Sequence, residues 1–351
     1  MKKTIAVLPG DGVGPEVTEQ SIKILQTIAE KFGHDFSFKQ GHIGAIAIDK
    51  IGNPYPDETR KLCIKSDAIL FGAIGDPKYD NDPKAKIRPE QGLLKMRKSL
   101  CLYANVRPIF TFEKLLNASP LKKEIISGTD FIVIRELIGG IYFGKRGRNK
   151  TRTSAFDTSE YSKKEIERVA IYAFKLAQKR KKKLTVVDKA NVLETSRLWR
   201  ETIQTMEKKF SNVAVNYMFV DNASMQIIKR PSEFDVIVTE NMFGDILTDE
   251  ASVIIGSLGM LPSASIGEKT AVYEPIHGSY PKATGQNIAN PIGSILSAAI
   301  MLEYSFGLKR ERDAIFNAVE QTINQGFGTK DLSPKIILGT KEFGDKIISL
   351  I

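Results

Sequence analysis

The chain has 351 residues, enough for about two domains at the usual ~100–200 residues each. It is 42% hydrophobic and 26% charged, which excludes disordered and collagen-like proteins, and its formal net charge is +10. Two cysteines, Cys63 and Cys101, argue against a disulfide framework. No apolar run approaches the ~20 residues of a membrane-spanning helix. We therefore expect a soluble, cytoplasmic protein without a membrane partner.

Short strands alternate with amphipathic helices along the chain. Apolar, mostly β-branched runs predict strands at 4–8, 68–73, 131–134, 184–187, 213–220 and 236–239. Apolar residues at helical spacing predict helices at about 15–31, 92–100, 162–178, 194–209, 223–229, 292–307 and 311–324. This alternation favours an α/β fold. Two long segments rich in Pro, Gly, Asp and Asn, 75–92 and 274–291, interrupt the pattern, and loops of that length are usually functional or disordered.

The segment GDGVGPE at 10–16 follows the first predicted strand and invites comparison with a dinucleotide-binding fingerprint. The third glycine of that fingerprint would fall at Pro15, and no acidic residue ends a second strand about 20 residues on. An ordinary Rossmann fold is therefore not expected. The glycines still predict a tight turn, and Pro15 suits the first turn of a helix.

Three arginines occupy positions that suit a carboxylate-binding site. Arg107 precedes a proline, which favours extended backbone, and Arg135 directly follows the strand 131–134, where ligands of α/β sheets bind. The third lies on a helix face with residues spaced i, i+3, i+4 and i+7: Glu90, Leu93, Leu94 and Arg97. Guanidinium groups bind carboxylates through two hydrogen bonds. The alternative is three unrelated arginines in ion pairs or on the surface.

Three aspartates that could bind a cation follow the predicted strand 213–220. Asp245 and Asp249 stand one helical turn apart, where like charges repel by a few tenths of a kcal/mol unless a cation lies between them. Asp221, at the end of the strand 213–220, is a natural third carboxylate. An all-oxygen ligand set fits Mg²⁺ or Mn²⁺. The alternative is a solvated acidic helix.

Two further residues are candidate proton carriers. Lys189 follows the strand 184–187, and near a metal and arginines its pKa would be lowered toward that of a general base. Tyr142 follows a pair of glycines that permit close backbone approach. A tyrosine among aromatic residues can instead belong to the core.

Seven motifs in order resemble the isocitrate/isopropylmalate family of metal-dependent β-decarboxylating dehydrogenases over almost the whole chain: GDGVGPE, RPEQGLLKMRKSLCLYANVRP, RELIGGIYFG, VDKANVL, ENMFGDILTDE, GSLGMLPSAS and EPIHGS…GQNIANP. The resemblance implies oxidative decarboxylation of (2R,3S)-3-isopropylmalate to 2-oxoisocaproate (4-methyl-2-oxopentanoate), a step of leucine biosynthesis. It also implies a large cofactor-side domain, residues 1–102 and 256–351, and a small domain, 103–255, with the dimer contacts and metal carboxylates.

The resemblance assigns roles to the candidate residues. The three arginines and Asp221 would bind the substrate, with Glu90, Leu93 and Leu94 around its alkyl group. Asp221, Asp245 and Asp249 would hold Mg²⁺ or Mn²⁺, Lys189 would remove the 2-hydroxyl proton, and Tyr142 would protonate the enolate. The site would be shared in a homodimer, with the neighbouring subunit supplying Lys189 and Asp221.

NAD is the cofactor implied by the resemblance. The residues expected around it are Glu274, His277, Gly278, Ser279, Lys282, Asn287, Ile288 and Asn290, with the 75–90 loop near the nicotinamide. NAD-specific members place an aspartate where this chain has Lys282, and NADP-using relatives have lysine followed by tyrosine, whereas Ala283 follows here. We therefore expect weakened discrimination against NADP, unless Lys282 is only a surface residue.

Two other functions stay open from the sequence. A homoisocitrate- or tartrate-type dehydrogenase would share the motifs, but an acidic Glu90 and two leucines favour an alkyl substituent over a third carboxylate at ~0.8 kcal/mol per buried CH₂. Outside enzymology, the basic run 179–183 would suit a nucleic acid. No aromatic residue interrupts that run, so a solvated helix end with no nucleic-acid partner is expected.

Overall fold

The computed structural model describes residues 1–81 and 86–351. The chain divides into two compact units: Met1–Leu102 with Gly256–Ile351, and Tyr103–Ile255. Both contain a sheet flanked by helices, which confirms the α/β class. No helix among the described residues is long and apolar enough to cross a membrane.

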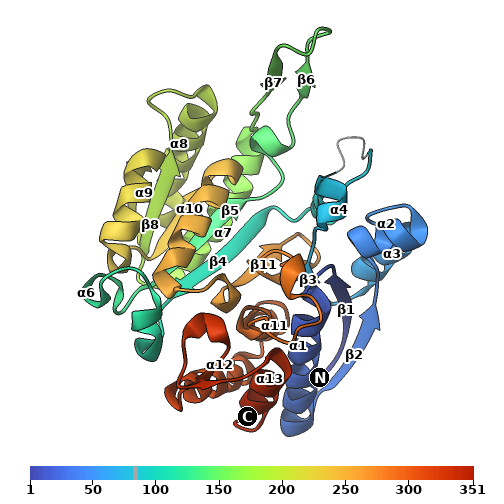
Figure 1. Ribbon diagram of the computed structural model, residues 1–351. Coiled ribbons are helices and arrows are strands. Elements are labelled where there is room, and N and C mark those ends of the chain that lie inside the picture. The colour runs from blue at the N-terminus through green and yellow to red at the C-terminus, as the bar shows by residue number, and fades with distance from the viewer. Residues whose placement is uncertain (82–85) are drawn as a thin grey trace. The chain divides into compact units, whose positions relative to one another are not determined.

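The first unit is built on five strands in the order β2-β1-β3-β12-β11 (Figure 1). Their bounds are β1 Lys2–Gly10, β2 Asp35–Gln40, β3 Ala68–Ala73, β11 Pro262–Ile266 and β12 Ala271–Pro275. β2, β1, β3 and β12 run parallel, and β11 is antiparallel to β12. β3 is buried at every residue, because helices and strands cover it on all sides.

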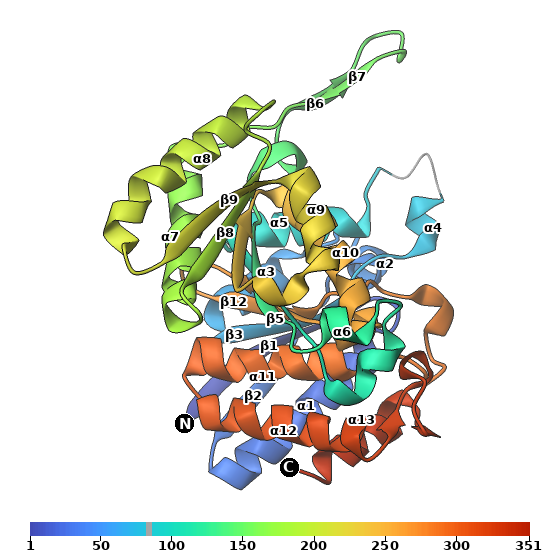
Figure 2. The same cartoon turned by 90° about the vertical axis from the view of Figure 1, so that its left-hand side faces the viewer.

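Eight helices belong to the described part of this unit: α1 Gly14–Phe32, α2 Ala45–Ile51, α3 Asp57–Lys65, α4 Pro77–Asp80, α5 Pro89–Ser99, α11 Ile292–Phe306, α12 Lys309–Asn324 and α13 Thr340–Ile348. Most of α11 is apolar and buried, since it packs against α1, α12, β11 and β12. Figure 2 shows α11 and α12 running side by side beneath the strands. A small parallel pair, β13 Phe327–Gly328 and β14 Ile336–Ile337, follows α12.

The second unit also has five main strands, in the order β4-β5-β10-β8-β9. Their bounds are β4 Ala104–Phe110, β5 Asp130–Glu136, β8 Lys183–Asp188, β9 Ala214–Phe219 and β10 Val236–Thr239. β4 is antiparallel to β5, and β5, β10, β8 and β9 are parallel.

The helices of this unit are α6 Lys123–Ile126, α7 Lys163–Lys179, α8 Glu194–Glu207, α9 Val220–Lys229 and α10 Asn241–Ile255. α7 and α8 pack on one face of the sheet, and α9 and α10 pack on the other and against each other (Figure 2). A two-stranded ribbon, β6 Arg146–Arg148 and β7 Ala155–Asp157, projects from the unit (Figure 1).

Some element boundaries differ from the sequence predictions. The strand predicted at 213–220 is Ala214–Phe219, so Asp221 lies in the first turn of α9 instead of closing a strand. The helix predicted at 92–100 is Pro89–Ser99 and therefore includes Glu90. The segment 75–92 contains α4 and the start of α5, and its residues 82–85 lie outside the described part of the chain.

Candidate active site

Arginines and aspartates meet in the second unit where β4, β5 and α10 pack together. The antiparallel register pairs Asn105 on β4 with Arg135 on β5. Arg107 lies on β4, two residues after Asn105. α10 approaches closely because residue 244 is glycine. A Cβ there would lie 2.7 Å from both Cβ and Cγ of Arg135.

Asp245 is the centre of this cluster. The buried guanidinium of Arg135 donates to its Oδ1, and Arg107 Nη2 lies 3.8 Å from the same oxygen. Arg107 Nη1 also lies 3.6 Å from Oδ1 of Asp249, whose side chain is 71% exposed. The two carboxylates that stand one turn apart on α10 are therefore both next to a guanidinium, which offsets their mutual repulsion.

Neutral side chains orient the two arginines. Arg135 Nε donates to Oδ1 of Asn241 at 2.9 Å, and Asn241 Nδ2 donates to the carbonyl of Gly139 at 3.0 Å. Arg107 Nε donates to Oδ1 of Asn105 at 2.7 Å, and its Nη1 donates to Oγ1 of Thr248. Sequence reasoning did not single out these three polar residues. Two of them lie within the ENMFGDILTDE motif, and Asn105 shares a strand face with Arg107 by the alternation of β-structure.

Tyr142 joins the cluster through its hydroxyl, which donates to Oδ2 of Asp245 at 2.9 Å. Its ring centroid lies 5.8 Å from Cζ of Arg135. Burial and the nearby Asp245 carboxylate raise the pKa of Tyr142 above its ordinary value, so the phenol is protonated at neutral pH. The chain reaches this position through Gly140, which has φ of +71° and leaves no room for a Cβ beside the hydroxyl of Tyr161.

A buried carboxylate supports the same region. Glu136, at the end of β5, accepts hydrogen bonds from the backbone N–H groups of Ile138 and Gly139 at 3.1 and 2.8 Å. Its burial raises its pKa to about 7, although the two hydrogen bonds act in the opposite direction. These bonds fix the backbone between Arg135 and Tyr142.

Lys189 and Asp221 form a second pair in this unit. Lys189 Nζ donates to Oδ1 of Asp221 at 2.7 Å, and this hydrogen bond lowers the pKa of the exposed Asp221 carboxyl. Among residues 1–81 and 86–351, no group of three or more His, Cys, Asp and Glu side chains is placed to hold a metal ion. The structure therefore brings Asp245 and Asp249 together but does not bring Asp221 to them within one chain.

The first unit carries the remaining substrate candidates on α5. Leu93 and Leu94 are half-buried and Glu90 is exposed. Arg97 Nη2 lies 3.8 Å from Oε1 of Glu274 on β12, and both side chains are about one-tenth exposed. The structure thus pairs a predicted substrate residue with a predicted cofactor residue.

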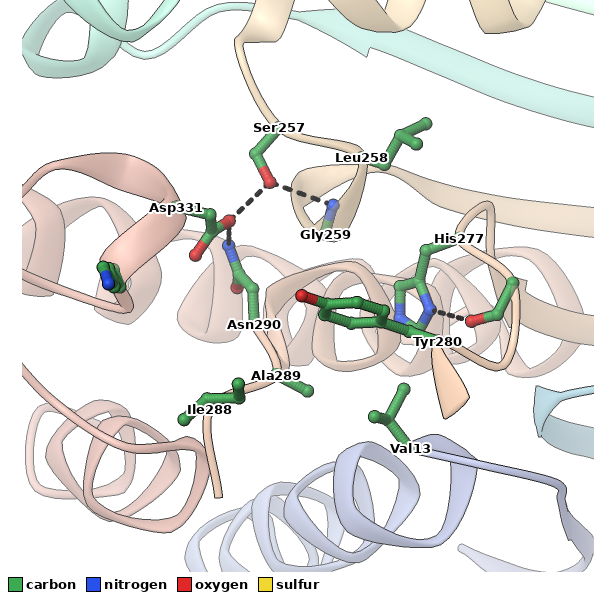
Figure 3. Close-up of a pocket in the computed structure, with 12 residues that line it drawn as sticks. Val13, Ser257, Leu258, Gly259, His277, Tyr280, Ile288, Ala289, Asn290 and Asp331 are labelled. Carbon is green, nitrogen blue, oxygen red and sulfur yellow. Dashed lines mark hydrogen bonds between the residues drawn. The ribbon is translucent and has the colours of Figure 1, made fainter. Parts of the chain in front are cut away.

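A cavity of about 880 Å³ opens in the first unit (Figure 3). Figure 3 shows Val13 and Ile288 on one side of it and Ser257 and Leu258 on the other. Its lining includes four residues predicted to bind the cofactor: His277, Gly278, Ile288 and Asn290. The other predicted cofactor residues, Glu274, Ser279, Lys282 and Asn287, do not line it. Lys282 is exposed in the turn Pro281–Ala283.

One end of the cavity carries a polar network that sequence reasoning missed. Asn290 Nδ2 donates to Oδ2 of Asp331 at 3.0 Å, and the Ser257 hydroxyl donates to the same oxygen (Figure 3). His277 Nδ1 lies 2.9 Å from the carbonyl of Gly278, whereas its buried Nε2 has no hydrogen-bond partner among the described residues. The cavity therefore combines apolar walls with polar groups that a bound molecule can engage.

Comparisons with known proteins agree with these features. The family model of isocitrate/isopropylmalate dehydrogenases matches residues 4–347. The 3-isopropylmalate dehydrogenase of Aquifex aeolicus is 53% identical over 354 aligned residues, which cover 99% of this chain and 97% of the relative. That of Geobacillus kaustophilus is 54% identical and covers 98% of this chain and 94% of the relative.

Solved structures show the same fold. An isocitrate dehydrogenase from Methylococcus capsulatus superposes with a TM-score of 0.89 at 31% identity, covering 99% of both chains. A β-decarboxylating dehydrogenase from Thermococcus kodakarensis gives a TM-score of 0.82 at 32% identity, covering 99% of this chain and 96% of that one. These matches confirm the resemblance carried by the sequence motifs: the chain belongs to the isocitrate/isopropylmalate dehydrogenase family.

Proposed function

We propose that this enzyme oxidises (2R,3S)-3-isopropylmalate with NAD and releases CO₂ to give 4-methyl-2-oxopentanoate, a step of leucine biosynthesis. Relatives about half identical over nearly the whole chain are named 3-isopropylmalate dehydrogenases. The observation that carries the proposal is the cluster of Arg107, Arg135, Tyr142, Asp245 and Asp249, because it joins carboxylate-binding, cation-binding and acid groups.

Substrate binding is assigned to the three arginines. Arg107 and Arg135 are held by neutral partners as well as by Asp245, so each keeps an orienting hydrogen bond when a substrate carboxylate takes up the remaining donors. Arg97 would provide a third guanidinium, and Leu93 and Leu94 on the same helix would contact the isopropyl group. Glu90 would repel a third substrate carboxylate, such as that of isocitrate, because both groups are negatively charged.

The donor set on α10 fits a hard divalent cation. Asp245 and Asp249 offer carboxylate oxygens one helical turn apart, the ligand type that Mg²⁺ and Mn²⁺ prefer. Asp221 would complete the set from a neighbouring subunit and would contact the substrate. When bound, the cation supplies Lewis-acid polarisation of the substrate's oxygen atoms.

Two residues of the chain would move protons. Lys189 would accept the proton of the 2-hydroxyl as hydride leaves C2 for the nicotinamide. Tyr142 would donate its phenolic proton to the enolate left by loss of CO₂, and its raised pKa keeps that proton in place at neutral pH. Its hydrogen bond to Asp245 fixes the direction of the hydroxyl in the absence of substrate.

The cavity in the first unit fits the adenosine half of the dinucleotide. Apolar Val13 and Ile288 suit an aromatic base. Its polar atoms could bind the Asn290–Asp331 pair and the His277 Nε2, which has no hydrogen-bond partner in the described part of the chain. NAD is the proposed cofactor. Lys282 lacks the carboxylate that would repel a 2′-phosphate, so discrimination against NADP is expected to be weak.

A homodimer with shared active sites is proposed for the second unit. Large apolar side chains are exposed on its two packed helices: Met225 on α9 is 56% exposed, and Ile246 and Val253 on α10 are 58% and 39% exposed. Covering such a surface favours association. The proposed location is the cytoplasm, where the two free cysteines would stay reduced.

The decisive experiment is turnover with a panel of 2-hydroxy diacids and both nicotinamide cofactors. We expect kcat/KM to be highest for 3-isopropylmalate, with isocitrate, homoisocitrate and tartrate far lower. Equal kcat/KM for isopropylmalate and isocitrate would refute the substrate assignment.

The nucleic-acid alternative depends on the basic run 179–183. Arg180 of this run already pairs with Asp130 and Asp235 at 2.9 and 2.8 Å. A salt-titrated gel shift that detects no binding would remove this alternative.

A further inference from the structure

One wall of the cavity is a loop that contains two residues with left-handed backbone. Ile288, Ala289 and Asn290 line the cavity, and the residues just before them include Gly285 with φ of +74° and Asn287 with φ of +56°. Glycine adopts left-handed backbone at no steric cost, and asparagine tolerates it better than most residues with a side chain. Contacts with other elements therefore decide how firmly the loop keeps this shape.

Glu16, in the first turn of α1, provides such a contact. Its Oε1 accepts the backbone N–H of Gly285 at 2.5 Å, and its Oε2 accepts that of Asn287 at 3.2 Å. One carboxylate thus binds two N–H groups on either side of Gln286. Apolar packing supports the same approach, because Val13, just before α1, and Val17 on α1 form a buried cluster with Ala283 and Ala289.

The start of α13 holds the loop independently. The backbone N–H of Thr340 donates to the Asn287 carbonyl at 3.0 Å, and that of Lys341 donates to Asn287 Oδ1 at 2.9 Å. The Thr340 hydroxyl donates to the carbonyl of Ala289 at 2.7 Å. Glu16 and α13 therefore fix residues 285–289 from two separate helices.

We infer that Glu16 is a positioning residue for dinucleotide binding: its carboxylate holds residues 285–287 so that the wall 288–290 is in its binding shape before the cofactor arrives. This inference rests on the proposed function of the cavity. Glu16 does not line the cavity, so it acts only through the loop. Preorganisation of a loop improves affinity because less conformational entropy is lost on binding. This gives the GDGVGPE motif a role that does not require a dinucleotide fingerprint.

The test is Glu16→Gln in the full-length enzyme, with Glu19→Gln as the matched control. Glu19 is exposed on the same helix, and its Oε1 lies 4.0 Å from Nζ of Lys23. In Gln one of the two accepting oxygens is replaced by an NH₂ group, which is a donor and cannot accept the second N–H. We expect the Kd for NADH, from fluorescence titration without substrate, and the KM for NAD to rise about tenfold. The KM for isopropylmalate and kcat at saturating NAD should stay within about twofold of the parent. The Glu19 variant should match the parent in all four.

A second measurement tests the parent enzyme directly. Amide hydrogen exchange at Gly285 and Asn287 should be slow in the cofactor-free parent and faster after Glu16→Gln. Fast exchange in the free parent would overturn the inference even if the variant did not fold, and so would unchanged NADH affinity in the variant. A parallel loss of kcat, thermal stability and affinity for both ligands would show a merely structural role and also overturn it. If the parent itself binds no NADH, the proposed function fails instead.

Discussion

Thr248 offers the sharpest test of how the arginines are held. Its buried hydroxyl accepts a hydrogen bond from Arg107 Nη1 and donates to the carbonyl of Gly244 at 2.7 Å. Thr248→Val keeps the shape of the side chain and removes the acceptor. Thr248→Ser keeps the hydroxyl and removes only the methyl group, so the two variants separate hydrogen bonding from packing.

The expected magnitude follows from the partners that Arg107 retains. A hydrogen bond to a charged group contributes roughly 1.5–3 kcal/mol, which corresponds to about a 10- to 150-fold change in binding. Arg107 keeps Asn105 at 2.7 Å, and Asp245 and Asp249 remain within 3.8 Å. We therefore expect the lower end, a rise of about tenfold in the KM for isopropylmalate with the KM for NAD unchanged.

Steady-state kinetics with each substrate varied in turn, together with urea unfolding, measures both effects. Thr248→Ser should lose about 1 kcal/mol of stability through the missing methyl group and keep its KM for isopropylmalate. If Thr248→Val and Thr248→Ser have the same kcat/KM for isopropylmalate, the hydroxyl does not orient Arg107 for substrate and the reasoning is wrong.

Three further outcomes are expected. Lys189→Ala and Asp245→Asn should each lower kcat by several orders of magnitude with unchanged circular dichroism, and near-normal turnover in either would contradict its assigned role. Lys282→Asp should raise the ratio of kcat/KM for NAD over NADP, and an unchanged ratio would make Lys282 a surface residue without a role in cofactor choice. Burial raises the pKa of Glu136 to about 7 from the ordinary 4.5. The unfolded chain therefore loses this proton at a lower pH than the folded chain. As a result, the free energy of unfolding falls by about 3 kcal/mol as pH rises from 4.5 to about 7. Urea unfolding at pH 4.5 and 7.5 should show a smaller fall for Glu136→Gln, and identical falls would argue against the raised pKa.

The strands that could be predicted are those with continuous apolar runs, such as β3, β5 and β10, because burial on both faces demands such runs. β2 was missed because it lies at the end of its sheet and its sequence, DFSFKQ, mixes polar and aromatic residues. β4 was missed because Arg107 and Pro108 interrupt it. Both strands depend on their neighbours for pairing, and that information is not local in the sequence.

The candidate active site, like the strands, could be predicted only in part. Spacing alone indicated that Asp245 and Asp249 share a helix face, and α10 contains both. It could not indicate that Arg107 and Arg135 reach them, since this depends on the antiparallel register of β4 with β5 and on the close approach of α10 at Gly244. The orienting roles of Asn241 and Thr248 depend on the same packing.

The arginine–aspartate contacts also determine how each of the two α10 carboxylates is held. Arg135 donates to Asp245 while Asn241 holds its Nε, so the guanidinium keeps its place through a neutral partner whichever anion occupies its other donors. Asp249 is different, because Arg107 Nη1 at 3.6 Å is its charged neighbour and its side chain stays largely exposed. The two carboxylates are thus held unequally: Asp245 accepts hydrogen bonds from Arg135 and Tyr142, whereas the charged neighbour of Asp249 is Arg107 at 3.6 Å. Because each carboxylate has a guanidinium beside it, the cluster leaves no buried charge unpaired, which would be strongly destabilising.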